Sequence, residues 1–141
     1  NFCETVSVKP MVNQVELHPY FAQEEALKTM EYYNVVPEAW APLGGGRHNP
    51  FENEMVKEIA AAHKKTVGQV VLRWNVQRGV VVIPKSVHKE RIEENFDIWD
   101  FSLTEKEVKQ ISSLDLGYTG TAVKHFDPDF VRMCTGRKIH D

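Results

Sequence analysis

The chain has 141 residues, of which 42% are hydrophobic and 26% charged, a balance typical of one globular domain with its own core. Its net charge of −3 gives no general attraction to nucleic acid or to an anionic membrane, and no apolar run is long enough to span a bilayer. The histidines and the two cysteines, Cys3 and Cys134, lack metal-ligand spacing, so we expect no metal site. We expect two free thiols in a reducing cytoplasm, with a disulfide between the two cysteines as the alternative.

The sequence predicts strands that alternate with helices. β-prone runs that stop at prolines predict strands over 11–17 and 35–41, and an apolar run without polar alternation predicts a strand over 80–83 that is buried on both faces. Capping-box patterns at Thr66 and Thr104 mark two helix starts, and Gly79 marks a helix end. Helices are predicted over 23–34, 54–64, 66–78, 86 or 88–96 and 104–114, with a glycine loop over 43–50 and an irregular tail over 117–141.

This order of elements favours an α/β fold. Strands joined through helices form right-handed crossovers and a parallel sheet. Three strands are few for such a sheet, and a complete (β/α)₈ barrel takes about 250 residues. We therefore interpret residues 1–141 as a single partial domain that supplies roughly half of a barrel.

The first motif that suggests a binding site follows the predicted strand over 80–83. It places Lys85 and Ser86 at the strand's carboxyl end and Arg91 in the helix that begins there. An ammonium, a hydroxyl, a guanidinium and a helix N-terminus together suit a phosphate dianion. On spacing alone, the motif also fits a solvated basic turn in which Ser86 caps the helix.

Two further motifs accompany the first two strands. One of the adjacent amides Asn13 and Gln14 must face a covered side of the sheet, where a carboxamide ligand or the neighbouring backbone would satisfy it. Trp40, near the end of the second strand, could stack on a heteroaromatic ring, and glycines 44–46 allow a pyrophosphate to approach; a core tryptophan and a flexible loop are the alternative.

In this order, the three motifs resemble the aldo-keto reductase family from about Lys9 to Leu114. The stretch I-P-K-S-V-x-x-E-R-I-x-E-N and the runs V-N-Q-V-E-L-H-P-Y and A-W-A-P-L-G carry the likeness. Trp40, where many animal members have tyrosine, is similar to the bacterial branch that includes the 2,5-diketo-gluconate reductases. The resemblance implies the C-terminal half of a (β/α)₈ TIM barrel, with about three parallel strands and covering helices.

The resemblance also implies that the chain binds NADPH. Ala41 departs from the serine common in animal members, which removes one expected hydrogen bond to the pyrophosphate. The implied contacts are Gln14 with the nicotinamide carboxamide, Trp40 with the nicotinamide ring, Leu43 with the pyrophosphate, Lys85, Ser86, Arg91 and the Val87 backbone with the 2′-phosphate, and Glu94 and Asn95 with the adenine.

Members of this family reduce aldehydes and ketones to alcohols with an aspartate, tyrosine, lysine and histidine set that lies on the first half of the barrel. No residue of this chain matches that set, so we expect a cofactor-binding oxidoreductase half that is catalytically incomplete alone. The alternatives are an inactive NADPH-binding module and a self-associating fragment. The expected partners are a small carbonyl substrate in the complete enzyme and either a second copy or an N-terminal half.

Overall fold

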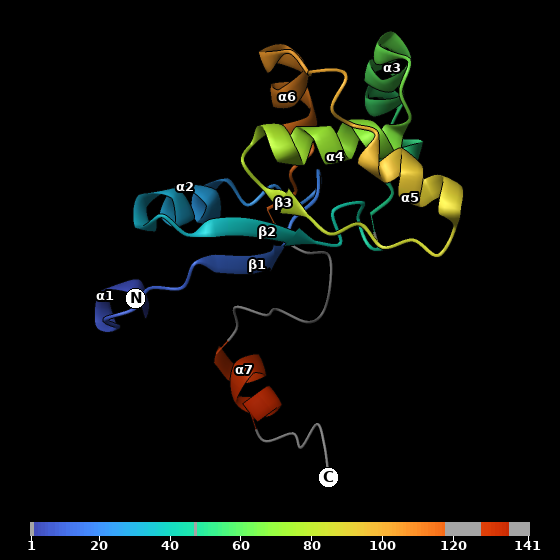
Figure 1. Ribbon diagram of the computed structural model, residues 1–141. Coiled ribbons are helices and arrows are strands. Elements are labelled where there is room, and N and C mark those ends of the chain that lie inside the picture. The colour runs from blue at the N-terminus through green and yellow to red at the C-terminus, as the bar shows by residue number, and fades with distance from the viewer. Residues whose placement is uncertain (1, 47, 118–127, 136–141) are drawn as a thin grey trace.

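The computed structural model describes residues 2–46, 48–117 and 128–135 (Figure 1). The elements in chain order are α1 (Phe2–Thr5), β1 (Val12–Glu16), α2 (Glu24–Tyr33), β2 (Val36–Trp40), η1 (Pro50–Glu52), α3 (Glu54–His63), α4 (Val67–Gln77), β3 (Val81–Val82), α5 (Lys89–Phe96), α6 (Glu105–Ser112) and α7 (Pro128–Thr135).

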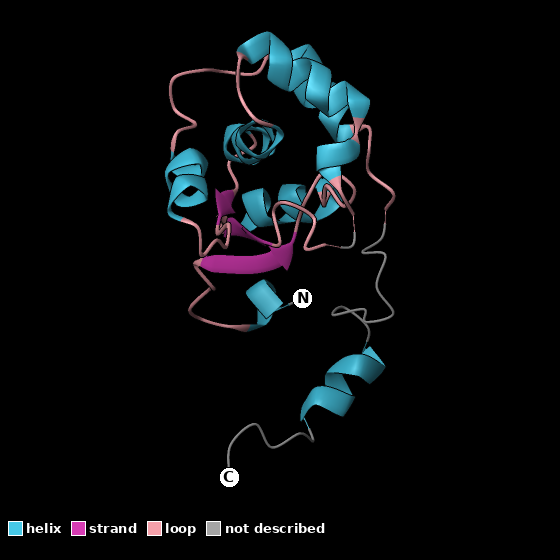
Figure 2. Cartoon of the chain, turned by 90° about the vertical axis from the view of Figure 1, so that its right-hand side faces the viewer, coloured by secondary structure: helices cyan, strands magenta, loops and turns pink. Residues whose placement is uncertain are grey.

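The three strands form one parallel sheet in the order β1-β2-β3. Val12 lies opposite Val36, Gln14 opposite Glu38, and Glu38 in turn opposite Val81. The predicted α/β fragment of three parallel strands with covering helices is confirmed. In the view of Figure 2, the helices of the main body lie on one side of the sheet and the N-terminal helix on the other.

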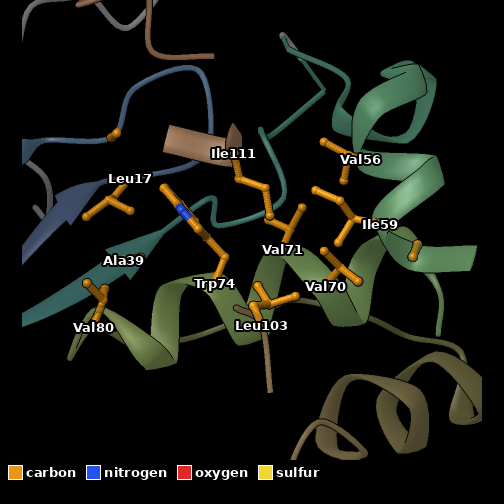
Figure 3. Packing of buried hydrophobic residues seen from close by; sticks show 12 residues of the cluster. Leu17, Ala39, Val56, Ile59, Val70, Val71, Trp74, Val80, Leu103 and Ile111 are labelled. Atoms are coloured by element: carbon orange, nitrogen blue, oxygen red, sulfur yellow. The ribbon is translucent and has the colours of Figure 1, made fainter. Parts of the chain in front are cut away.

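The hydrophobic core fills the space between the sheet and the helices (Figure 3). Trp74 of α4 lies at its centre, fully buried, and its indole Nε1 donates to the Ser112 hydroxyl of α6 at 3.1 Å. The Arg78 guanidinium covers the same ring at 4.1 Å from the ring centroid. The other fully buried members are Leu17, Ala22, Ala39, Val56, Val70, Val71 and Ile111, so strands and helices contribute to one core.

Among the described residues, no such layer of helices covers the opposite side of the sheet. Because side chains alternate along a strand, the residues in register with Gln14 share one face. On that face Val12, Val36 and Val81 are 51%, 44% and 45% exposed. We call this surface, formed by Val12, Gln14, Val36, Glu38 and Val81, the open face.

The prediction of a strand over 80–83 buried on both faces is wrong in this structure. β3 is only two residues long, and while Val80 is buried, Val81 and Ile83 are each 45% exposed. The physical reason is position: β3 is the last strand of the described sheet, so it pairs only with β2, and helices cover only one of its faces.

Local signals in the helices are confirmed. The Thr66 and Thr104 side chains accept hydrogen bonds from the backbone N–H groups of Gln69 and Glu107, whose side chains bond back to the cap backbone. Gly79 adopts a left-handed φ of 76° just beyond α4, where a side chain would be strained.

Three short helices were not predicted. α1 and η1 fall in stretches without helical periodicity, and α7 lies in the tail that the sequence predicts to be irregular. α7 has proline as its first residue and an ion pair of 2.7 Å between Asp129 and Arg132, both of which favour a helix start.

Among the described residues, no helix is long and apolar enough to cross a membrane, and no group of three or more histidine, cysteine or acidic side chains could hold a metal ion. Cys3 carries a free thiol, whereas the side chain of Cys134 lies outside the described part.

Candidate functional site

The predicted site residues fall into two groups along the carboxyl ends of the strands. Gln14, Trp40 and Leu43 lie on or just after β1 and β2, and the remaining residues lie between the end of β3 and the end of α5. In parallel α/β folds, ligands bind at the carboxyl ends of the strands, which is where Trp40, Leu43 and the second group lie, whereas Gln14 is the middle residue of β1.

Gln14 lies on the open face, where it faces a carboxylate. Its Nε2 donates to Glu38 Oε1 at 2.5 Å across the β1–β2 ladder. Glu38 was not predicted as a site residue. Its position 24 residues from Gln14 becomes meaningful only once the strand register is known.

Trp40 is the last residue of β2 and is half-buried opposite Glu16. The chain then turns sharply, with Ala41 at a left-handed φ of 51° and the Gly44 N–H donating to the Ala41 carbonyl at 2.9 Å. A Cβ at Gly44 would lie 2.0 Å from the His48 carbonyl oxygen. The glycine is therefore required by the loop itself, whatever ligand approaches it.

A cluster of aromatic and acidic side chains adjoins this loop, and the sequence did not predict it as a unit. His18 is fully buried, and its Nε2 lies 3.4 Å from Glu16 Oε1. The His48 ring lies 5.4 Å from that of His18 and 5.3 Å from that of Tyr20, between ring centroids. These contacts fix the turn after β1 against the loop after β2, which gives His18 a structural role.

The phosphate motif adopts the expected strand-to-helix arrangement. α5 begins at Lys89, and its N-cap residue, His88, makes no side-chain capping hydrogen bond. The His88 N–H donates to the Ser86 hydroxyl at 3.1 Å, so Ser86 bonds to the residue before the helix and does not cap it. Lys85 and Arg91 are exposed, and neither forms an ion pair with any residue that the structure describes. The two cations therefore remain available to an anionic ligand.

Arg91, Glu94 and Asn95 share one side of α5, because residues three and four apart on a helix are neighbours. A ligand that lies along this side of α5 would meet Arg91 with its phosphate and Glu94 and Asn95 with its base. Val87 is exposed in the segment before the helix, as a backbone contact requires.

Hydrogen bonds link Glu94 to the N-terminal end of α4. Thr66 Oγ1 donates to Glu94 Oε1 at 2.5 Å, and the Gln69 amide donates to the Asp97 carbonyl at 2.7 Å just after α5. Lys65 reinforces this junction through Asp100 and Asp97, at 2.8 and 2.9 Å. The hydrogen bonds that Lys65 donates to Asp100 first, and then to Asp97, raise its pKa above the ordinary value.

A separate apolar groove of about 910 Å³ lies between β3 and α5. It is lined by side chains from the β3 edge and from the side of α5 that carries Ile92 and Phe96, together with Ile98 and Trp99 beyond the helix. Of the predicted site residues, only Asn95 lines it. An apolar groove beside a free strand edge suits a packing partner better than a charged dinucleotide.

Comparisons with known proteins identify the family of this chain. Residues 3–116 match the model of the Aldo/keto reductase family. The chain is 47% identical over 113 residues to the 9,11-endoperoxide prostaglandin H2 reductase of Trypanosoma cruzi (strain CL Brener), a match that covers 79% of this chain and 40% of that protein. It is 40% identical over 114 residues to the methylglyoxal reductase DkgA of Escherichia coli (strain K12), covering 81% and 42%.

Among solved structures, the chain superposes on a Bombyx mori aldo-keto reductase in complex with NADP. The TM-score is 0.79 at 29% identity, and the match covers 85% of this chain and 42% of that one. The chain thus spans about two fifths of the length of the relatives it matches.

Proposed function

This chain belongs to the aldo/keto reductase family, and from that premise we propose that it is the cofactor-binding C-terminal half of an NADPH-dependent reductase of aldehydes and ketones. One observation carries the proposal: Lys85 and Arg91 flank the start of α5 at the carboxyl end of a parallel strand, without an ion pair among the described residues. Two such cations beside a helix N-terminus suit the binding of a phosphate group.

The residues present fit the adenosine end of NADPH. Lys85, Ser86 and Arg91 would hold the 2′-phosphate, with the Val87 backbone beside them, and Glu94 and Asn95 would contact the adenine. Because NADH has a hydroxyl in place of that phosphate, the two cations would select NADPH. Hydrogen bonds to charged groups contribute about 1.5–3 kcal/mol each, so the expected preference is tenfold or more.

The residues on β1 and β2, and in the loop after β2, fit the nicotinamide end of the cofactor. NADPH would supply the hydride that reduces a carbonyl carbon. Gln14, whose amide orientation is fixed by Glu38, would hold the carboxamide; Trp40 would stack on the nicotinamide ring, and Leu43 would lie against the pyrophosphate. In this role the chain orients the ring and shields one side of it from water.

The proton that completes the reduction would come from residues outside this chain. The family's aspartate, tyrosine, lysine and histidine set has no counterpart here, so the chain alone is proposed to bind the cofactor without turning it over. Similarity to the methylglyoxal reductase DkgA and the presence of Trp40 support a bacterial, small-carbonyl branch. The chain is 47% identical to the trypanosome relative and 40% identical to DkgA. Overall identity therefore does not favour the bacterial branch, and Trp40 is its main support.

We also propose that the open face and the apolar groove receive the remaining strands and helices of the barrel. The support is the length of the relatives, of which this chain spans about two fifths, together with the free edge of β3 and the exposed valines. Without those elements, a second copy of the chain is the expected cover.

A titration with two readouts tests the proposal. NADPH is added to the purified chain while tryptophan fluorescence is followed, and aldehyde-dependent NADPH oxidation is then assayed. Quenching without turnover supports a cofactor-binding half. Turnover above background means that the chain carries a catalytic set of its own. No quenching, in a chain that circular dichroism shows to be folded, leaves only a structural fragment and rejects the proposed cofactor role.

A further inference from the structure

The hydroxyl of Thr66 links two elements. It accepts a hydrogen bond from the Gln69 N–H at 3.2 Å, which caps α4, and it donates its single proton to Glu94 Oε1 at 2.5 Å. A threonine hydroxyl has one proton and two lone pairs, so both bonds can form at once. The N-terminus of α4 and the Glu94 carboxylate are therefore joined through one atom.

Gln69 fastens the backbone at the same place. Its Oε1 accepts from the Thr66 N–H at 3.0 Å, while its Nε2 donates to the carbonyls of Asp97 at 2.7 Å and Glu94 at 3.3 Å. The side chain is buried, with 5% of the residue exposed. Glu94 is thus held through its carboxylate by Thr66 and through its backbone by Gln69.

The first turn of α4 also limits the space around this carboxylate. A Cβ at Gly68 would lie 3.7 Å from Glu94 Oε1, at van der Waals distance. The second oxygen, Oε2, receives no hydrogen bond from the residues that the structure describes. One carboxylate oxygen is therefore fixed by the protein, and the other remains available to a ligand.

We propose that Thr66 is a positioning residue that makes the site selective for adenine over other purines; this rests on the proposed function, in which Glu94 contacts the adenine. A carboxylate only accepts hydrogen bonds. Held in one place, it pairs with the 6-amino group of adenine and opposes the 6-oxo group of hypoxanthine. Once free to move, it can reach the N1–H of hypoxanthine instead, and the selectivity falls.

The test compares two ligands, adenosine 2′,5′-bisphosphate and inosine 2′,5′-bisphosphate. They carry the same phosphates and differ at the purine ring, so the ratio of their Kd values reports base selectivity and cancels the contribution of Lys85 and Arg91. Isothermal titration at fixed salt and pH measures both constants for each variant.

Two substitutions at the same position separate positioning from folding. Thr66→Ser keeps the donor and the cap. Thr66→Asp keeps an N-cap acceptor, which helices favour at this position, but removes the proton that Glu94 accepts and repels its carboxylate. We expect wild type and Thr66→Ser to prefer the adenosine ligand about tenfold or more, and Thr66→Asp to lose most of that preference.

The outcomes distinguish failure of the role proposed for Thr66 from failure of the cofactor site on which that role rests. An unchanged preference in Thr66→Asp, with circular dichroism and Tm like those of wild type, overturns the role of Thr66 alone. If Thr66→Asp does not fold, Thr66→Gly takes its place, because glycine is tolerated at an N-cap and removes the hydroxyl while Glu94 stays. Loss of preference in Thr66→Gly supports the role of Thr66, and retention overturns it. A wild-type chain that binds neither bisphosphate overturns the proposed cofactor site itself.

Discussion

The two ends of the candidate cofactor site differ in how completely this chain builds them. At the adenosine end, α5 is held against α4 by hydrogen bonds from Thr66 and Gln69 and by the ion pairs of Lys65. At the nicotinamide end, Gln14 and Glu38 lie on the open face, beside valines about half exposed. The comparison teaches that the described residues brace the proposed adenosine end on two elements, whereas they leave the proposed nicotinamide end on an exposed face of the sheet.

The largest expected effect concerns catalysis. The isolated chain is expected to show no aldehyde-dependent oxidation of NADPH above the cofactor's own background, because general acid–base assistance contributes roughly 10²–10⁴-fold and its residues lie elsewhere in the family. A full-length relative assayed in parallel provides the positive control. Robust turnover by the purified chain would mean that the nicotinamide end is complete after all.

Variants at the two ends of the candidate cofactor site should affect the binding of different parts of the cofactor. Arg91→Ala should weaken NADPH binding about tenfold or more and leave NADH nearly unchanged, because the guanidinium is expected to contact only the 2′-phosphate. Gln14→Ala is the matched variant at the other end and should leave adenosine 2′,5′-bisphosphate binding unaltered. Equal affinity of the wild-type chain for NADH and NADPH, in a salt-controlled titration, would reject the phosphate assignment.

The open face should govern assembly. With its valines exposed and two free strand edges, the isolated chain is expected to form a homodimer or a larger species, measured by light scattering at high micromolar concentration. Val81→Lys should shift the distribution toward monomer, because a charge at a buried dimer contact must be desolvated.

Replacing an exposed residue on the other side of the molecule, as in Lys106→Ala, serves as the control for assembly. A monodisperse wild-type monomer would contradict the predicted role of the open face.

The smallest expected effect is the acid sensitivity of the α6 cap. Burial alone would raise the pKa of Glu107, but hydrogen bonds from Thr104 and then from His63 outweigh it and leave the pKa below its ordinary value. Because the folded-state pKa is depressed, the resulting stability is present at neutral pH and is lost as the pH falls from the ordinary glutamate pKa of about 4.3 through the folded-state value.

Glu107→Gln should therefore lower the free energy of unfolding at pH 7 by about 1 kcal/mol or less and flatten its decline in acid. Urea unfolding at pH 7 and at successive acid values measures this dependence. An acid decline as steep in the variant as in the wild-type chain would exclude Glu107 as its source.

Some features could be predicted from the sequence because they depend on neighbours along the chain. The capping boxes at Thr66 and Thr104 involve partners three residues away, and Gly79 ends α4 through its own backbone conformation. Apolar periodicity likewise gave the order of strands and helices. α7 was missed because its signals, a proline and one ion pair, are weak in a polar stretch.

The sequence by itself determined the order of the three strands and of the five longer helices between Glu24 and Ser112, and which charged groups follow β3. Only the tertiary structure decided that Gln14 meets Glu38, 24 residues away, that Thr66 holds Glu94, 28 residues away, and that Val81 faces outward. The physical reason is range. Helix caps and turns close within a few residues, whereas these contacts depend on strand register, on the packing of α5 against α4, and on which face of the sheet the helices leave uncovered.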